Sequence, residues 1–294
     1  MNGRRIISDK QNKFSRFCAI YDKIIDAWPF KVESCFIETR LGRTHALIAG
    51  DAHAPPLVLL HGGNSTAIMW ADFLKQLASG YRLIAVDLIC DYGKTVYQKP
   101  VKKVDDYLVW LEELLLSLGL KSAFFAGFSY GGWLVINLCL HKPELVQKAS
   151  CYAPAGGLIP LSKRFLLQAA WTFIFPQKKI IKDFFLNASH PSLHSDPEYI
   201  KEVDELVELV EAGRKLRANF VSPRVLTDVQ LSSIVTPVQL FIGDSEVICD
   251  PHQAVKRAKN CFKSAETFLL ADASHDLMYT YKEFLCRKII EFFD

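Results

Sequence analysis

Short continuous apolar runs alternate with amphipathic stretches along the first half of the chain. The runs are Leu57 to Leu60, Leu83 to Val86 and Ala123 to Ala126, and the stretches between them carry apolar side chains at steps of three and four. A continuous apolar run is typical of a strand buried on both faces, and the stepped spacing is typical of a helix with one buried face. The pattern therefore predicts an α/β fold with a mostly parallel central sheet flanked by helices.

Chemically useful residues follow these runs at the points where the strands should end. His61, Gly62 and Gly63 follow the first run, Asp87 follows the second, and Ser129 comes shortly after the third. The carboxyl ends of parallel strands meet at one edge of a sheet, which is where such folds bind their ligands. We therefore expect a functional site at this edge.

The rest of the chain adds elements at both ends of this sheet. Apolar steps predict a helix from Phe14 to Trp28 that packs on the core, because its polar face is not rich in lysine. Two β-rich runs, 34–40 and 44–49, predict a hairpin joined by residues 41–43. The later expected elements are strands at 148–152, 238–242 and 267–270, and helices at 251–260 and 281–293.

The alternation breaks after residue 154, where an aromatic and aliphatic segment begins. A second amphipathic pattern between Asp196 and Arg217 predicts a helix with Asp196 as its N-cap and Pro197 as its first residue. Residues 155–232 are therefore expected to form a helical cap inserted between two parts of one core, 1–154 and 233–294. Part of the apolar side chains in the cap should line a pocket over the strand ends.

Composition excludes several classes of function. With 50% hydrophobic residues among 294 the chain can bury a large core, and 35 basic against 32 acidic residues do not indicate a nucleic-acid partner. No apolar run is long enough to span a membrane, and no secretory signal is visible. The eight cysteines are scattered without a Cys-x-x-Cys pair, so we expect free thiols and a cytoplasmic protein.

A serine between two glycines predicts the reactive centre. Ser129 stands between Gly127 and Gly131, where an apolar run passes into a helical stretch. This is the pattern of a nucleophile elbow, in which a tight turn holds the serine near positive φ and the glycines leave room for strand and helix. The helix that begins at Tyr130 should aim its first N–H groups at the serine, so the Tyr130 amide is a candidate oxyanion donor. The pattern is short, and a simple glycine-rich turn stays an alternative reading until partners are found.

A serine nucleophile needs a histidine base within hydrogen-bond reach. His275 follows the last predicted strand, at the edge of the sheet where Ser129 is expected. His252 is the rival base, but it follows Pro251 and would begin a helix instead of ending a strand. His275 is therefore the predicted base.

Three carboxylates compete to orient this base, and all lie in the loop after residue 242: Asp244, Glu246 and Asp250. Asp250 precedes a proline and could instead cap the following helix. Glu246 stands where the loop should turn toward the functional edge, and this position favours it as the acid.

The other histidines receive structural interpretations. His61 is expected to order its own loop by hydrogen bonds. His190 and His194 are four residues apart, a spacing that could bind a metal on a helix, but Pro191 disfavours a helix there and no third ligand clusters nearby. We therefore predict no metal and no cofactor. The remaining histidines are expected at the surface or in loops: His45, His53 and His141.

These motifs together resemble the α/β-hydrolase fold family, and the chain is most similar to bacterial carboxylesterases of the naproxen-esterase type. The similar stretches run nearly from end to end, although the loop after Asp87 lacks the family's usual Gly-His-Gly and Ser274 stands where glycine is common. The resemblance implies that the acid is a glutamate, at the position of Glu246. The motifs that carry it are His61-Gly62-Gly63, Gly127-Phe128-Ser129-Tyr130-Gly131-Gly132, Gly243-Asp244-Ser245-Glu246 and Ser274-His275.

The predicted activity is hydrolysis of a small apolar carboxylic ester. Ser129 is expected to attack the carbonyl, His275 to move the proton and Glu246 to orient His275, while the backbone amides of Gly63 and Tyr130 bind the oxyanion. The same triad could act on a carbon–carbon or amide bond or carry out perhydrolysis, and a ligand-binding signalling protein with slow turnover is the alternative from another class. The sequence leaves acyl chain length and oligomeric state open.

Overall fold

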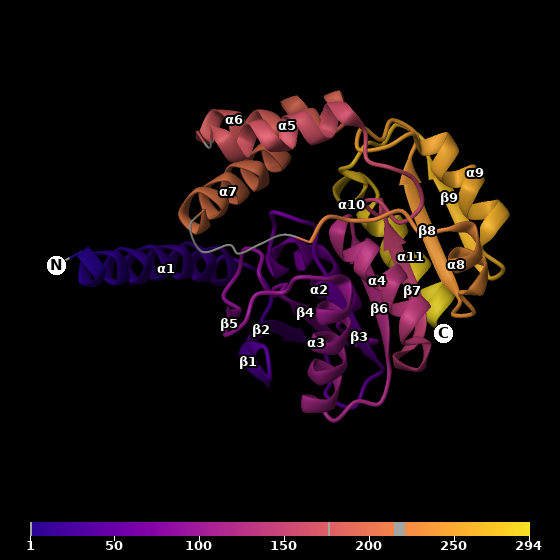
Figure 1. Cartoon of the computed structure of the whole chain (residues 1–294), viewed down its shortest axis with the longest axis horizontal. Coiled ribbons are helices and arrows are strands. Elements are labelled where there is room, and N and C mark those ends of the chain that lie inside the picture. Colours follow the sequence, from indigo (N-terminus) through magenta and orange to yellow (C-terminus); the bar gives the residue numbers. More distant parts are fainter. Residues whose placement is uncertain (1, 176, 215–220) are drawn as a thin grey trace.

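One sheet runs through the computed structural model, which describes residues 2–175, 177–214 and 221–294 (Figure 1). The strands are ordered β1-β2-β4-β3-β6-β7-β8-β9, and β5 pairs with β2. All pairs from β4 to β9 are parallel, whereas β2 pairs antiparallel with β1, β4 and β5, so the predicted mostly parallel sheet is confirmed. The strands are β1 (Glu33–Thr39), β2 (Gly42–Ala49), β3 (Pro56–Leu60), β4 (Arg82–Val86), β5 (Val96–Tyr97), β6 (Ala123–Phe128), β7 (Val146–Tyr152), β8 (Val238–Gly243) and β9 (Ala265–Leu270).

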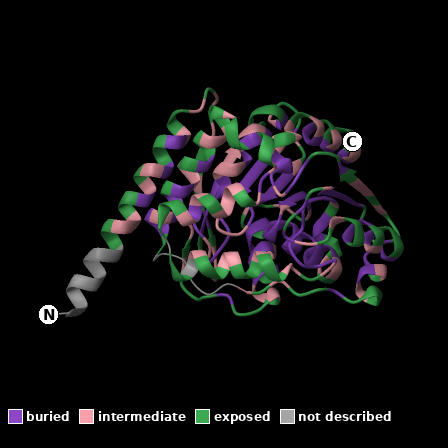
Figure 2. Cartoon of the chain, turned by 90° about the horizontal axis from the view of Figure 1, so that it is seen from above, coloured by how far each residue is buried: buried purple, intermediate pink, exposed green. Residues whose placement is uncertain are grey.

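Helices cover both faces of this sheet and divide the apolar core into two layers. Successive residues of β3 show the division, because Val58 and Leu60 belong to one layer and Leu57 and Leu59 to the other, and all four are fully buried. Figure 2 shows the buried residues concentrated in the sheet and on the inner sides of the helices. The helices outside the segment between β7 and β8 are α1 (Asn2–Asp26), η1 (Ala67–Trp70), α2 (Ala71–Leu77), α3 (Val104–Ser117), α4 (Tyr130–His141), η2 (Pro143–Leu145), α9 (Pro251–Cys261), α10 (Leu277–Thr280) and α11 (Lys282–Phe293).

The first helix is longer than its apolar spacing predicts. It begins at Asn2 instead of Phe14, and the predicted packing on the core is confirmed by the complete burial of Phe17 and Tyr21. Apolar steps mark only the part of a helix that packs against something, so they do not show where α1 begins. In the hairpin, β2 begins at Gly42 instead of Thr44, and the short strand β5 was not predicted.

Between β7 and β8 the chain leaves the sheet and forms helices over the edge where the parallel strands end (Figure 1). The predicted start of α7 is confirmed, because the Asp196 carboxylate accepts hydrogen bonds from the N–H groups of Glu198 and Tyr199 at 2.9 and 3.2 Å. The predicted end at Arg217 lies outside the described residues, and the division of the chain at 155 and 232 stays a prediction. The helices are α5 (Lys163–Ile174), α6 (Lys178–Asn187), η3 (Pro191–Ser195), α7 (Pro197–Gly213) and α8 (Asp228–Ser233).

No helix among the described residues combines the length and the apolar content needed to cross a lipid bilayer.

Candidate active site

The turn between β6 and α4 holds Ser129 in a backbone conformation that non-glycine residues rarely adopt. Its φ is 50° and its ψ is −111°, as the glycine-flanked pattern predicts. The turn is fixed from both sides, because the Ser129 N–H donates to the Tyr152 C=O at 2.8 Å and the Ser129 C=O accepts from Trp133 at 3.0 Å. A side chain held in such a conformation indicates a functional constraint.

The two flanking glycines allow the close approach that this turn requires. A Cβ on Gly131 would lie 2.1 Å from the Leu60 C=O oxygen, and one on Gly127 would lie 2.5 Å from the Gly131 C=O oxygen. Any larger residue would push α4 away from β3 or from its own strand. The sequence interpretation of these glycines is therefore confirmed in physical detail.

The structure brings together the three side chains predicted to form the triad. His275 Nε2 lies 2.9 Å from Ser129 Oγ, and His275 Nδ1 lies 2.9 Å from Glu246 Oε2. The Glu246 side chain is fully buried, whereas that of His275 is 12% exposed. A hydroxyl, an imidazole and a buried carboxylate in this order can transfer a proton from the hydroxyl while the carboxylate stabilises the imidazolium.

Backbone hydrogen bonds fix the Glu246 carboxylate. Its Oε1 accepts from the N–H groups of Val247 and Ile248 at 2.8 and 3.0 Å, which leaves Oε2 for His275. The Glu246 loop is bound to the His275 loop, because the Ser245 N–H donates to the Ala273 C=O at 2.9 Å. The Glu246 side chain thus reaches His275 Nδ1 from a loop whose backbone is held beside the His275 loop.

The rival acids and the rival base lie elsewhere. Asp250 caps α9 by accepting from the Gln253 N–H at 3.0 Å, as the alternative interpretation expected. Asp244 accepts a hydrogen bond from the hydroxyl of its neighbour Ser245 at 3.0 Å. His252 is an exposed residue in the first turn of α9.

Three neighbours that sequence reasoning missed hold His275 in place. The Phe128 ring packs against the imidazole with centroids 4.8 Å apart, and the His275 N–H donates to the Ala188 C=O at 3.0 Å. Asp276 is buried and its carboxylate accepts from the Ser274 N–H at 3.1 Å and from the Thr280 hydroxyl at 2.6 Å. The sequence signal for these contacts was Asp276 itself, an aspartate directly after the predicted base.

The segments that carry the two predicted oxyanion donors flank Ser129. Tyr130 is the first residue of α4, and Gly63 lies half-buried in the loop after β3. That loop passes close to the serine, because a Cβ on Gly62 would lie 3.3 Å from Ser129 Cβ. The assignment of the Gly63 and Tyr130 amides as donors stays a prediction.

His61 orders this loop, as expected. Its Nε2 accepts from the Leu88 N–H at 2.9 Å, so Nδ1 carries the proton and donates to the Gly62 C=O at 2.7 Å. The fully buried imidazole therefore links the ends of β3 and β4 and fixes the backbone just before Gly63.

The expectation for His45 is wrong. His45 is fully buried in β2, where its Nδ1 lies 2.8 Å from Asp87 Oδ2 and its Nε2 lies 2.8 Å from the hydroxyl of Ser34, an exposed residue of β1. Asp87 is also fully buried and accepts hydrogen bonds from the Tyr21 hydroxyl and from the N–H groups of Ala67 and Lys94. Its role is structural, because it joins α1, β2, η1 and the loop after β4. The alternating strand pattern could not reveal this partner, which lies 42 residues away.

The pKa of Asp87 is lowered in the folded protein. Burial on its own would raise it, but the attraction of His45, the hydrogen bond to that ring, and the Ala67 N–H outweigh burial. Because the folded pKa lies below the unfolded value near 3.8, the stabilisation is fully present above that pH and is lost as pH falls through the folded pKa.

We expect Asp87→Asn to lower the free energy of unfolding by about 2 to 4 kcal/mol at neutral pH, because a buried charge that accepts four hydrogen bonds is replaced by a neutral amide. Urea unfolding at pH 7 and at pH 3 measures the effect. The difference between the two proteins should shrink at pH 3, because below the unfolded pKa near 3.8 the unfolded wild type binds a proton at this carboxyl that it must release on folding. A difference that is equal at both pH values would contradict the role assigned to this charge.

The other candidate ligands and nucleophiles have local partners. His190 Nδ1 lies 2.8 Å from the Ser192 hydroxyl, and His194 Nε2 lies 2.9 Å from the Leu186 C=O. Among the described residues no group of three or more histidine, cysteine, aspartate or glutamate side chains could hold a metal ion. Cys249 lies near the triad, but burial, with the nearby charges of Glu246 and Asp250, raises its pKa to about 12, so its thiol stays protonated.

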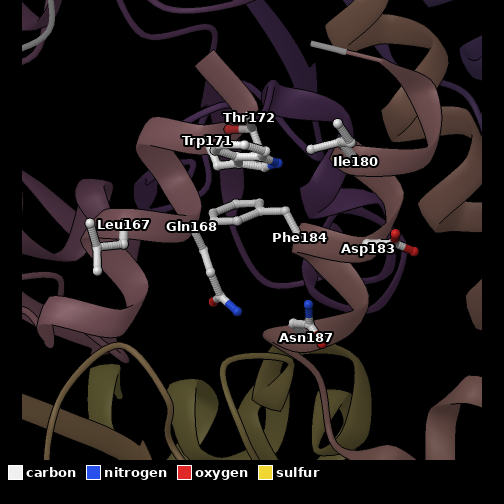
Figure 3. A pocket seen from close by; sticks show the side chains of 8 residues that line it. All are labelled: Leu167, Gln168, Trp171, Thr172, Ile180, Asp183, Phe184 and Asn187. Carbon is white, nitrogen blue, oxygen red and sulfur yellow. The ribbon is translucent and has the colours of Figure 1, made fainter. Parts of the chain in front are cut away.

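A cavity of about 460 Å³ lies between α5 and α6 (Figure 3). Its lining is mainly apolar and includes Leu167, Trp171 and Phe184, while the expectation that apolar side chains of the cap line a pocket over the strand ends stays a prediction. Asn187 stands at one end of this cavity, directly before Ala188, the residue that binds the His275 backbone. The cavity thus adjoins the segment that positions the triad. Its lining residues are Leu167, Gln168, Trp171, Thr172, Ile180, Asp183, Phe184 and Asn187.

Comparison with known proteins finds one matching family and several similar chains. Residues 57–286 match the Alpha/beta hydrolase family. Over 280 residues the chain is 30% identical to the "Uncharacterized carboxylesterase nap" of Bacillus subtilis (strain 168), covering 95% of this chain and 92% of that protein. It is also similar to solved structures of two Bacillus subtilis enzymes. Carboxylesterase CesB (YbfK) has a TM-score of 0.87 at 28% identity, with 96% of this chain and 98% of that chain covered, and naproxen esterase (carboxylesterase NP) has a TM-score of 0.84 at 28% identity, with 95% and 97% covered.

Proposed function

Because the chain belongs to the alpha/beta hydrolase family, we propose that it is a serine carboxylesterase in which Ser129, His275 and Glu246 act as nucleophile, base and orienting acid. The observation that carries the proposal is the distance of 2.9 Å from His275 Nε2 to the hydroxyl of a serine held at a φ of 50°. The names of the relatives, which are carboxylesterases, support the ester as substrate.

In the proposed reaction Ser129 Oγ attacks the ester carbonyl carbon while His275 Nε2 takes the hydroxyl proton. The carbonyl oxygen becomes an oxyanion bound by the amides of Gly63 and Tyr130, and its collapse expels the alcohol, which takes the proton from His275. Water then attacks the acyl-serine with His275 again as base, and the acid is released. Glu246 stays ionised throughout and holds Nδ1–H of the imidazole.

The substrate we propose is a small apolar ester, because the cavity between α5 and α6 is lined mainly by apolar side chains. None of its lining residues belongs to the triad, but one of them, Asn187, directly precedes Ala188, whose C=O binds the His275 backbone. The eight cysteines are all free in the described structure, which supports a reducing compartment such as the cytoplasm.

We expect p-nitrophenyl esters of short apolar acids to be hydrolysed with an initial burst of nitrophenol, because the good leaving group makes acylation of Ser129 faster than hydrolysis of the acyl-enzyme. The matched control is the p-nitroanilide of the same acid, which should react far more slowly. Stopped-flow absorbance measures both. Faster cleavage of the anilide or of a β-diketone would show that the protein is an amide or carbon–carbon bond hydrolase and not an esterase. Tight binding of the ester without turnover would support the ligand-binding alternative.

A further inference from the structure

Helix α5 presents an apolar face to solvent. Leu167, Trp171 and Ile174 are 72%, 55% and 63% exposed, and their spacing of four and three places them on one side of the helix. The opposite side carries Phe165, whose ring packs against Phe184 of α6 with centroids 5.6 Å apart. A surface helix of a globular protein normally turns its polar side to water. In α5 one apolar side is covered by α6, whereas the other apolar side faces solvent.

The exposed apolar side chains are concentrated on this helix. Five of the fifteen exposed large hydrophobic side chains in the described structure lie between residues 166 and 175, and the others are spread over the rest of the chain. The rings of Trp171 and Phe175 are in contact, with centroids 4.3 Å apart. A continuous patch of this kind marks an interaction site, whereas single exposed residues do not. We call it the α5 patch, and it consists of Leu166, Leu167, Trp171, Ile174 and Phe175.

Basic residues border the α5 patch. Residues 162–187 contain five basic side chains and the single acid Asp183, a net charge of 5 − 1 = +4. Lys178 and Lys182 pair with acids of α7, so the positive charge that faces outward comes from the exposed Lys163, Arg164 and Lys179. Lys163 lies four residues before Leu167 and therefore on the same side of α5 as the patch.

We propose that the α5 patch binds the surface of a lipid bilayer that contains anionic lipids. A Trp/Leu/Ile face bordered by lysine and arginine is the composition of helices that lie in the membrane interface, where the apolar side enters the acyl boundary and the cations meet the headgroups. Charge argues against a second copy of this chain as the occupant. A two-fold dimer would place each patch on its equivalent and bring the two basic borders together.

The α5 patch also adjoins the cavity. Leu167 and Trp171 belong to the patch and line the cavity as well (Figure 3). A bilayer bound to the patch would therefore lie at the mouth of the cavity. Binding itself requires no catalysis, so the proposal extends beyond the esterase and is tested without turnover.

The full-length protein should sediment with vesicles of equimolar phosphatidylglycerol and phosphatidylcholine, and much less with vesicles of phosphatidylcholine alone. Salt at about 0.5 M should release it, because the Debye length is then only a few ångströms. Trp171 provides a second measurement, as the emission that the wild type has and Trp171→Phe lacks, because Trp70, Trp110 and Trp133 are buried but Trp28 is only half-buried. Lipids with brominated acyl chains should quench this emission.

Two variants distinguish binding through the α5 patch from nonspecific adsorption of the protein to vesicles. Ile174→Glu changes a residue of the patch that is 63% exposed and does not line the cavity, and it should weaken partitioning on the order of tenfold. Val229→Glu is the matched control, because it makes the same kind of change at a side chain 80% exposed on α8, and it should bind as the wild type does. Thermal unfolding checks that both variants fold.

Three results would overturn the proposal. The first is equal sedimentation with neutral and anionic vesicles, and the second is equal loss in both variants. The third combines two findings: the wild type does not sediment with vesicles, and sedimentation velocity shows a wild-type dimer that Ile174→Glu dissociates. Together they would show that the patch binds a second copy of this chain.

Discussion

Ser129→Ala should lower kcat for ester hydrolysis on the order of 10⁶-fold, because the hydroxyl forms the covalent bond to the acyl group and only binding and oxyanion stabilisation would remain. Folding should be retained, since alanine is smaller and keeps the N–H and C=O groups that fix the turn to Tyr152 and Trp133. Steady-state kinetics with a p-nitrophenyl ester measures the loss, and a fluorophosphonate probe should label the wild type at Ser129 alone.

The chain offers a close control in Ser34. Its hydroxyl lies 2.8 Å from His45 Nε2, as Ser129 Oγ lies 2.9 Å from His275 Nε2, and each histidine also contacts a buried carboxylate. Ser34→Ala should leave turnover and labelling unchanged. Labelling that persists in Ser129→Ala and disappears in Ser34→Ala would show that the wrong serine has been assigned.

Glu246→Gln should lower kcat by about 10³- to 10⁴-fold. The amide oxygen can still accept from the Val247 and Ile248 N–H groups, so the side chain stays in place. Its NH₂ group would then face His275 Nδ1, where it favours the tautomer with the proton on Nε2 and leaves no acceptor for the Ser129 proton. The loss should fall on kcat, with the melting temperature little changed.

The two rejected carboxylates are the controls for this loss. Asp250→Asn should keep both rate and fold, because asparagine is as good an N-cap for α9 as aspartate. Asp244→Asn should also be close to wild type, since its observed partner is the hydroxyl of Ser245. Kinetics and thermal unfolding of the three amide variants side by side decide the matter, and a collapse of activity in either control with full activity in Glu246→Gln would show that the acid is misassigned.

The sheet could be predicted because the apolar pattern of each strand lies within a few consecutive residues of the sequence. Four successive apolar residues in β3 require burial on both faces, and the residues that follow each parallel strand must then lie at one edge. The approach of Gly131 to Leu60 follows from the same logic, because a glycine in the first turn of a helix indicates a neighbouring backbone. The strand ends therefore predict one edge for Ser129 and His275, whereas the choice of Glu246 over Asp244 and Asp250 rests also on the resemblance to carboxylesterases.

The parts that could not be predicted depend on contacts between distant elements. His45 looks like a polar residue of a half-exposed hairpin, and only the pairing of β2 with β4 places it beside Asp87. The outward side of α5 is a similar case. Periodicity shows that a helix has an apolar face, but it does not show whether that face meets the protein or the solvent.

The pair of serine–histidine–carboxylate arrangements has a consequence for recognising enzymes by shape. A search with side-chain distances as its template would return Ser34 and Ser129 as equals. They differ in the main chain, because Ser34 lies in the extended edge strand β1, whereas Ser129 lies in a turn with a φ of 50° that ends at the start of a helix. Converting the first arrangement into a second catalytic centre would thus require rebuilding a strand into a turn, a change that no single substitution supplies.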